Sequence, residues 1–226
     1  MTGRLLHLVG HDGTARGDDA LALARTIAAG RDVQRVVLHV VAARGDTQKL
    51  SASRIDRLDA DARKRVEAIG DRLGAPESLE VVEARSPARG LHDWAEDRQA
   101  DLVIVGARRA STGRLHLASG TVAAGLLAGG PCAVALAPAG YAEGPRRLGR
   151  IVVAFDGSNE AHSALAEAAA LAVAGGALVD VVYGYDHAAF PRYPGTVAEA
   201  EVAADALART GLEATPVAVR GVSATR

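Results

Sequence analysis

The residues with the most evident chemistry lie in one long connection, "GARRASTGRLHLASGTVAAG" at residues 106–125. Glycines let a main chain approach a bound group closely, and the first turn of a helix offers free N–H groups to a phosphate. Gly106 ends an apolar run, and Gly120-Thr121 stands where a helix is expected to begin. The connection also carries positive charge, on Arg108, Arg109, Arg114 and His116. It is a candidate phosphate-binding loop, although arginines in such a loop are also typical of a solvated surface.

A carboxylate is expected on the other side of the same site. The stretch "GHDG" follows the first apolar run of the chain and presents Asp12. In doubly wound sheets, ligands bind beyond the carboxyl ends of the strands, where the winding direction reverses. That place lies between the first and the fourth strands, so Asp12 and the loop after Gly106 are expected to face each other. An Asp-Gly pair after a strand also forms an ordinary turn, and both interpretations of Asp12 stay open.

Short apolar runs and longer amphipathic segments must position these residues. The runs "RLLHLVG", "VQRVVLHVV", "LEVVEA", "ADLVIVG" and "PCAVALAP" predict strands buried on both faces, which is typical of a parallel sheet. Between them, residues 52–74 predict a helical segment with one apolar face, and Ser86-Pro87 predicts the start of another helix. Through about residue 138 the order of elements predicts an α/β fold, a doubly wound five-stranded parallel sheet of strand order 3-2-1-4-5.

The opening pattern of the chain returns at an offset of 144 residues. "LVGHDGTARGDDALALARTIA" aligns without a gap with "VVAFDGSNEAHSALAEAAALA", which pairs Asp12 with Asp156 and Thr14 with Ser158. Both hydroxyl residues are expected to cap a helix, whereas Asp156 is expected only to form a turn. We predict a domain at residues 1–138, a linker at 139–149, and a partial second copy (β-α-β-α-β) at 150–226, with a helix near 196–210 and a strand near 213–219. This copy lacks a counterpart of residues 86–137.

These motifs together resemble a known family. The stretches "DGT" and "DGS" after a first strand, "LHVV" in the second, and "VGARRASTGRLHLASGTVAAGLL…PCAVALAP" are similar to the universal stress proteins. The resemblance covers nearly the whole chain, as a tandem pair with a truncated second member. Many members of that family bind ATP with a loop of the form G-x2-G-x9-G-[ST]. Here Gly106 matches the first glycine and Gly120-Thr121 the last pair, but Arg109 stands at the second glycine and the spacing has one extra residue.

The resemblance implies a nucleotide site made of Asp12, Val40, Val105, Gly106, Arg109, Gly120, Thr121 and Val122. It places Asp12 and the main chain of Val40 near adenine and ribose, and Val105 beneath the nucleotide. The residues from 120 to 122 are implied at the phosphates, with Mg²⁺ bound only together with ATP. The side chain of Arg109 either crowds a turn that needs glycine or pairs with a phosphate.

Composition and charge argue against several classes of protein. The 26 basic residues nearly balance 27 acidic ones, and a net charge of −1 argues against a nucleic-acid-binding or membrane-surface protein. No apolar run approaches the ~20 residues that span a bilayer, so we expect a soluble, cytoplasmic protein. The chain contains no phosphate-loop lysine motif, nucleophile elbow or metalloprotease motif and no identifiable metal site. We therefore expect no enzyme, and at most slow, incidental ATP hydrolysis.

Two functions of different classes remain. The first is a stress-response or regulatory protein that binds ATP or another adenine nucleotide in residues 1–138. The alternative is a nucleotide-free interaction or scaffold protein of the same fold, which Arg109 and the extra loop residue favour. In either case we predict a homodimer, because the first strand of the partial second copy lacks a neighbour and forms an open edge. No nucleic-acid or membrane partner is expected.

Overall fold

The computed structural model describes residues 4–74, 77–107, 121–144, 147–185, 201, 204–205 and 214–220. The chain divides into two compact units, Met1–Arg146 and Arg147–Arg226. Each unit has its own sheet and its own buried core.

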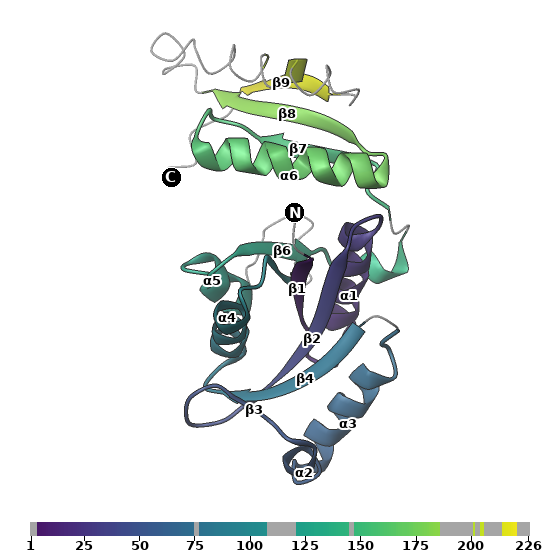
Figure 1. Cartoon of the computed structure of the whole chain (residues 1–226), viewed down its shortest axis with the longest axis vertical. Helices are drawn as coiled ribbons and strands as arrows, with labels where there is room; N and C mark the ends of the chain where they lie inside the picture. The colour runs from purple at the N-terminus through teal and green to yellow at the C-terminus, as the bar shows by residue number, and fades with distance from the viewer. Residues whose placement is uncertain are drawn as a thin grey trace. The chain divides into compact units, whose positions relative to one another are not determined.

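The first unit is built on a mostly parallel sheet (Figure 1). Its parallel strands are β1 (Leu5–Gly10), β2 (Val33–Ala42), β4 (Glu77–Ala84), β5 (Leu102–Gly106) and β6 (Ala133–Ala137). They are ordered β4-β2-β1-β5-β6, which is the predicted order 3-2-1-4-5. A sixth strand, β3 (Gln48–Lys49), pairs antiparallel with β4 at the edge and was not predicted. Its two exposed polar residues have no apolar pattern that could indicate a strand.

Helices cover both faces of this sheet (Figure 1). The helices α1 (Ala15–Ala28) and α3 (Ala60–Gly70) pack on one face, and α4 (Pro87–Arg98) and α5 (Thr121–Leu127) pack on the other. Successive residues of a strand point to opposite faces, so Leu8 joins the core under α4 whereas Val9 joins the core under α1. Burial on both faces is why the strands read as continuous apolar runs.

The predicted helix starts are present. The Thr14 side chain accepts a hydrogen bond from the Arg16 N–H at the start of α1, and the Ser86 side chain accepts one from the Arg89 N–H at the start of α4. Pro87 occupies the first turn of α4, where its missing N–H leaves no hydrogen bond unmade. The apolar face of this helix is buried, at Leu91, Trp94 and Ala95.

The helical segment expected over residues 52–74 is divided. A short helix α2 (Ala52–Ile55) is followed by a break and then by α3. The reason is local, because the Asp59 carboxylate accepts a hydrogen bond from the Ala62 N–H and so starts a new helix. Of the predicted apolar face, Ala62 and Ile69 are buried, and Ile55, Leu58, Val66 and Leu73 are partly buried.

The segment expected to be a linker is partly structured. A 3-10 turn, η1 (Tyr141–Glu143), lies against α1 within the first unit. The buried Asp19 carboxylate of α1 holds it, accepting the N–H of Gly140 at 2.9 Å and that of Ala142 at 2.8 Å. The first unit thus extends beyond β6, to residue 146.

The second unit contains a smaller parallel sheet of order β7-β8-β9, with one helix packed on it. Its elements are β7 (Arg150–Ala154), α6 (Asn159–Gly175), β8 (Leu178–Tyr185) and β9 (Ala214–Arg220). The expected strand near 213–219 is β9, and most of the expected helix near 196–210 lies outside the described residues. Together with the first sheet, this confirms the predicted fold class of one α/β unit and an incomplete second copy.

The duplicated turn has the same geometry in both units. Asp12 Oδ1 accepts the Thr14 N–H at 3.1 Å, and Asp156 Oδ1 accepts the Ser158 N–H at 3.0 Å. The glycine in each turn has a φ of 80°, a left-handed conformation that favours glycine. Ser158 caps α6 by accepting the Ala161 N–H. Asp156 is exposed and forms the predicted turn.

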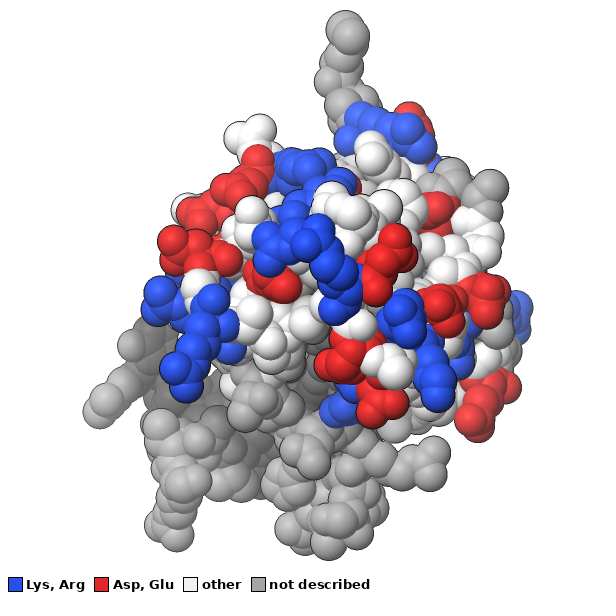
Figure 2. Space-filling view, turned by 90° about the horizontal axis from the view of Figure 1, so that it is seen from below, with Lys and Arg blue, Asp and Glu red and all other residues white. Residues whose placement is uncertain are grey.

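Charges on the surface are mixed. Figure 2 shows one face of the molecule, on which basic and acidic side chains are interspersed. Elsewhere in the first unit several charged side chains form ion pairs, as in Arg54 with Glu83 at 2.7 Å and Arg72 with Asp18 at 2.8 Å. Among the described residues, no helix is both long enough and apolar enough to cross a bilayer.

Candidate functional site

A cavity of about 360 Å³ opens at the carboxyl end of the first sheet. It lies where β1 has β2 on one side and β5 on the other, which is the point where the winding direction reverses. Its volume is in the range of small-molecule sites. The lining residues are Gly10, His11, Asp12, Arg16, Gly17, Leu38, His39, Val40, Pro87, Leu91, Val105, Gly106, Val122 and Ala123.

Most of the predicted site residues that the structure describes lie in this cavity. The residues brought together are Asp12, Val40, Val105, Gly106 and Val122. They come from four places in the chain: the turn after β1, the strands β2 and β5, and the first turn of α5.

Three other predicted residues have no described side chain. Arg109 and Gly120 lie outside the described residues. Thr121 is the first residue of α5, and its side chain also falls outside the description. The phosphate-binding loop itself therefore stays a prediction.

One wall of the cavity is apolar. Leu38 of β2, Leu91 of α4 and Val105 of β5 are buried at its base, and Val40 and Val122 are partly buried beside them. These side chains belong to the core between the sheet and the helices α4 and α5. The cavity is thus continuous with a packed apolar core, which gives a flat, uncharged ligand group a rigid surface to contact.

Gly106 allows the end of β5 to lie directly against the start of α1. A Cβ atom at this position would overlap the carbonyl oxygen of Arg16. Any other residue would push β5 away from α1. Because both elements line the cavity, the cavity would change shape as well. The glycine was predicted because it allows close approach to a ligand, and the structure shows a close approach to the protein's own main chain.

Asp12 is held firmly by its neighbours. Its Oδ1 accepts hydrogen bonds from the Thr14 N–H at 3.1 Å and the Thr14 hydroxyl at 2.6 Å, and its Oδ2 lies 2.7 Å from Arg16 Nη2. Burial alone would raise the pKa of the Asp12 carboxyl, but the Thr14 hydrogen bonds and the Arg16 charge outweigh it and lower that pKa. Asp12 is therefore ionised at neutral pH and presents a negative charge to the cavity.

The His11 side chain is buried and hydrogen-bonds to the turn that carries Asp12. Its Nδ1 accepts the Gly13 N–H at 3.0 Å, so the ring proton lies on Nε2, which donates to Asp18 Oδ1 at 3.3 Å. Burial lowers the pKa of His11, although the nearby Asp18 opposes the shift. A Cβ on Gly17 would overlap the His11 ring, so helix α1 can begin here only because that residue is glycine.

His39 also hydrogen-bonds to the turn that carries Asp12. It is buried within β2 and its Nδ1–H donates to the His11 carbonyl at 2.8 Å. The structure places it in the strand, in the cavity lining, and in contact with the turn that carries Asp12.

Arg16 and His11 were not singled out from the sequence. A signal for each was available, because Arg16 follows Asp12 by four residues on the first turn of a helix, and His11 directly precedes Asp12. Neither spacing is specific enough to identify a functional residue alone. Their position in the cavity depends on how α1 packs against β5.

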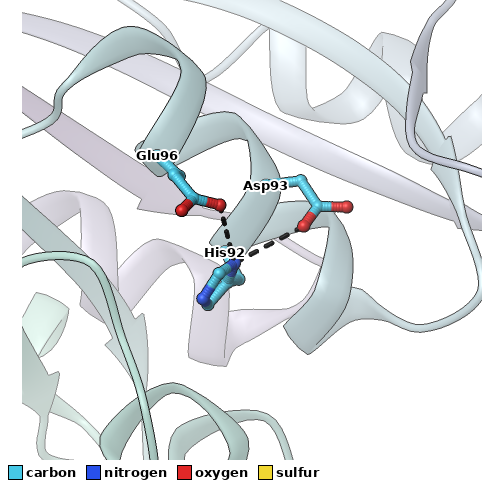
Figure 3. A group of neighbouring side chains, drawn as sticks. All are labelled: His92, Asp93 and Glu96. Atoms are coloured by element: carbon cyan, nitrogen blue, oxygen red, sulfur yellow. Dashed lines mark ion pairs between the residues drawn. The ribbon is translucent and has the colours of Figure 1, made fainter.

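A second polar group lies on α4, where His92, Asp93 and Glu96 converge (Figure 3). His92 Nδ1 lies 3.4 Å from Asp93 Oδ1 and 3.8 Å from Glu96 Oε2, a spacing that could accommodate a cation. Arg89 Nε, however, lies 2.7 Å from the same Asp93 oxygen and supplies a positive charge from the protein itself. His92 Nε2 donates to the Gly129 carbonyl at 3.1 Å. We interpret this group as a structural network that ties α4 to the end of α5.

Comparison with solved structures shows where this architecture occurs. A universal stress protein from Archaeoglobus fulgidus DSM 4304 is 15% identical, with a TM-score of 0.66 over 97% of this chain and 80% of that one. The protein PA1789 from Pseudomonas aeruginosa PAO1 is 17% identical, with a TM-score of 0.57 over 96% of this chain and 74% of that one. Similarity at this level of identity shows a shared fold.

A shorter match is a universal stress protein solved in complex with cAMP, at 22% identity, which covers 60% of this chain and 98% of that one with a TM-score of 0.40. No curated protein matches the chain. The model of the universal stress protein family matches residues 7–138 and 148–224, one segment in each unit. The chain therefore belongs to the universal stress protein family.

Proposed function

We propose that this chain is a regulatory stress-response protein of the cytoplasm that binds ATP or another adenine nucleotide in the cavity of its first unit. The observation that carries the proposal is the convergence of Asp12, Val40, Val105, Gly106 and Val122 on one cavity. These residues were selected from the sequence for their resemblance to nucleotide-binding members. Members of the family often bind ATP.

The cavity offers a suitable surface to each part of a nucleotide. The apolar wall of Leu38, Val40 and Val105 suits the faces of an adenine ring. The Asp12 carboxylate is an acceptor for ribose hydroxyls. By the family resemblance, the phosphates extend toward Thr121 and Val122, and Arg109 and Gly120 belong to the same proposed site. Mg²⁺ is proposed only as a companion of bound ATP.

The described lining favours binding over catalysis. A general base needs a free lone pair within reach of the proton that it removes. Among the described lining residues, His11 Nδ1 and Asp12 are already engaged by Gly13 and by Thr14 and Arg16, and no Ser, Thr, Cys or Lys nucleophile accompanies His39. We therefore propose no enzymatic role beyond slow, incidental hydrolysis of ATP.

Isothermal titration with ATP and Mg²⁺ tests the proposal. We expect saturable heat at tens of micromolar protein, and we expect Asp12→Asn to weaken binding by about tenfold because one charged acceptor is lost. Asp156→Asn is the matched control, because Asp156 forms the same turn in the second unit and is exposed. Absence of heat with the unmodified protein would disprove nucleotide binding.

The alternative is a nucleotide-free interaction protein of the same fold. Arg109 replaces a glycine of the family loop, and the loop has one extra residue. The same titration with Arg109→Gly separates the two functions. Binding that appears only in the variant supports a degenerate site and the alternative, whereas weaker binding in the variant makes Arg109 a phosphate partner.

We also propose that the protein is a homodimer. Val152 of β7 is 61% exposed, whereas Leu8, at the equivalent position of β1, is fully buried under α4. In the first sheet β1 lies between two strands, and in the second sheet β7 lies at the edge. An exposed apolar edge strand is a typical site for association with another chain.

A further inference from the structure

We propose that Arg16 makes the site selective for phosphorylated ligands, because a phosphate can displace Asp12 as the partner of its guanidinium. This inference rests on the nucleotide site proposed above and assigns a role within it to a residue outside the family loop. Its basis is the ion pair of Arg16 with Asp12 at the cavity.

The ion pair stands at the open side of the cavity. Arg16 Nη2 lies 2.7 Å from Asp12 Oδ2, and the two side chains are 47% and 44% exposed. Both residues line the cavity, so a ligand that enters it meets this pair. Exposed pairs of this kind contribute little to stability, and exchanging one partner for another has a small energetic cost.

In this arrangement Asp12 has one acceptor position left for a ligand, on Oδ2. Its Oδ1 already accepts two hydrogen bonds from Thr14, and its Oδ2 accepts the bond from Arg16. A ribose hydroxyl therefore shares Oδ2 with the guanidinium, whose positive charge weakens that oxygen as an acceptor. An uncharged nucleoside offers Arg16 no partner that could draw it away from Asp12.

A phosphate offers Arg16 a second partner. A guanidinium has five N–H donors and binds phosphate oxygens in pairs, so a phosphate is at least as good a partner for Arg16 as a carboxylate. Once Arg16 turns to the phosphate, Asp12 Oδ2 is free for the ribose. Phosphate and ribose binding therefore assist each other within a single ligand.

The main chain allows Arg16 to move without disturbing the fold. Its N–H donates to the Thr14 hydroxyl that caps α1, and its carbonyl oxygen is packed against Gly106. The guanidinium group can therefore change partner by side-chain rotation while the helix start stays in place. Among the described lining residues, Arg16 is also the one side chain that is positively charged at every physiological pH.

The experiment compares AMP with adenosine by isothermal titration of the full chain and of Arg16→Ala. We expect the variant to bind AMP about tenfold more weakly, since it loses one charge-assisted contact. We expect it to bind adenosine at least as well as the unmodified protein, because Asp12 is released. The ratio of the two affinities should therefore fall by about tenfold or more.

Three controls make the outcome decisive. Arg54→Ala removes the same charge from a surface pair with Glu83 and should leave both affinities unchanged. Arg16→Lys keeps the charge and should retain part of the preference for AMP. Circular dichroism and melting temperature show whether Arg16→Ala is folded, which is expected because the Thr14 cap accepts from a main-chain N–H.

The possible failures are distinguishable. If the unmodified protein binds neither ligand, the proposed nucleotide site is wrong. If it binds AMP and Arg16→Ala changes both affinities by the same factor, the nucleotide site stands and the role of Arg16 is wrong. A loss of adenosine binding in folded Arg16→Ala would also contradict the inference.

Discussion

At the scale of single residues, the site depends on a histidine that burial keeps neutral. His11 is enclosed beneath the Asp12 turn, where it accepts from Gly13 and donates to Asp18. Burial lowers its pKa from the ordinary value of 6.5. The neutral ring is what the geometry requires, because Nδ1 can accept the Gly13 N–H only as an unprotonated nitrogen.

This burial predicts a pH dependence of folding. Below the ordinary pKa of histidine, the unfolded chain binds a proton at His11 that the folded chain does not, so stability falls as the pH decreases. We expect the free energy of unfolding to fall more between about pH 7.5 and 5.5 for the unmodified protein than for His11→Asn. The asparagine Oδ1 can still accept the Gly13 N–H but does not titrate. Urea unfolding at each pH measures the difference, and parallel profiles would contradict this role of His11.

At the scale of elements, a buried carboxylate connects three parts of the first unit. Glu77 begins β4, and its side chain is 1% exposed. It accepts hydrogen bonds from Arg25 of α1 at 2.7 Å, from Arg35 of β2 at 3.2 Å and from the Gly74 N–H at 3.0 Å. Burial alone would raise the pKa of Glu77, but these donors outweigh it and lower that pKa. The network fixes α1 against the sheet, and α1 carries Arg16.

Glu77→Gln should therefore destabilise the first unit. The substitution leaves two guanidinium groups without their counter-charge, and we expect a loss of about 2 kcal/mol, less than for a fully buried pair because Arg25 still reaches water. Glu83→Gln is the control, since its pair with Arg54 is solvent-exposed and should matter by less than about 0.5 kcal/mol. Urea unfolding measures both variants, and we expect a lower midpoint concentration for Glu77→Gln than for Glu83→Gln. Equal midpoints would show that the buried network adds nothing.

At the scale of the whole molecule, one strand–turn–helix pattern is used twice with different surroundings. In the first unit β1 is covered by β5 at its side and by α4 on one face, and the cavity forms beside it. In the second unit, the described residues place α6 on one face of the sheet and leave β7 at its edge. The same turn, at Asp12 and Asp156, thus faces a ligand-sized cavity in one unit and solvent in the other.

The proposed homodimer can be tested through this edge. Sedimentation velocity at tens of micromolar should give a mass twice that of the 23.1 kDa chain. Val152→Lys should shift the protein toward the monomer, because a lysine at an edge strand opposes pairing. Val173→Lys is the control, since Val173 is 73% exposed and lies on the helix α6, not on the edge strand. A monomeric mass at every concentration would rule the dimer out.

Much of the fold was predictable because its determinants are periodic. Strands buried on both faces produce uninterrupted apolar runs, and the helix caps at Thr14, Ser86 and Ser158 are local signals. The strand β3 and the break before Asp59 were missed, because each depends on a few polar residues that carry no periodic pattern.

The sequence by itself determined the two copies of the fold and the strand order of the first copy. It also determined that Asp12 and Gly106 lie near one site, because the carboxyl ends of parallel strands meet at one edge of the sheet. Only the tertiary structure decided which side chains meet there. The contacts of Glu77 with Arg25, and the packing of Gly106 on Arg16, join residues far apart in the chain. Such contacts depend on the packing of whole helices against the sheet, which no local pattern encodes.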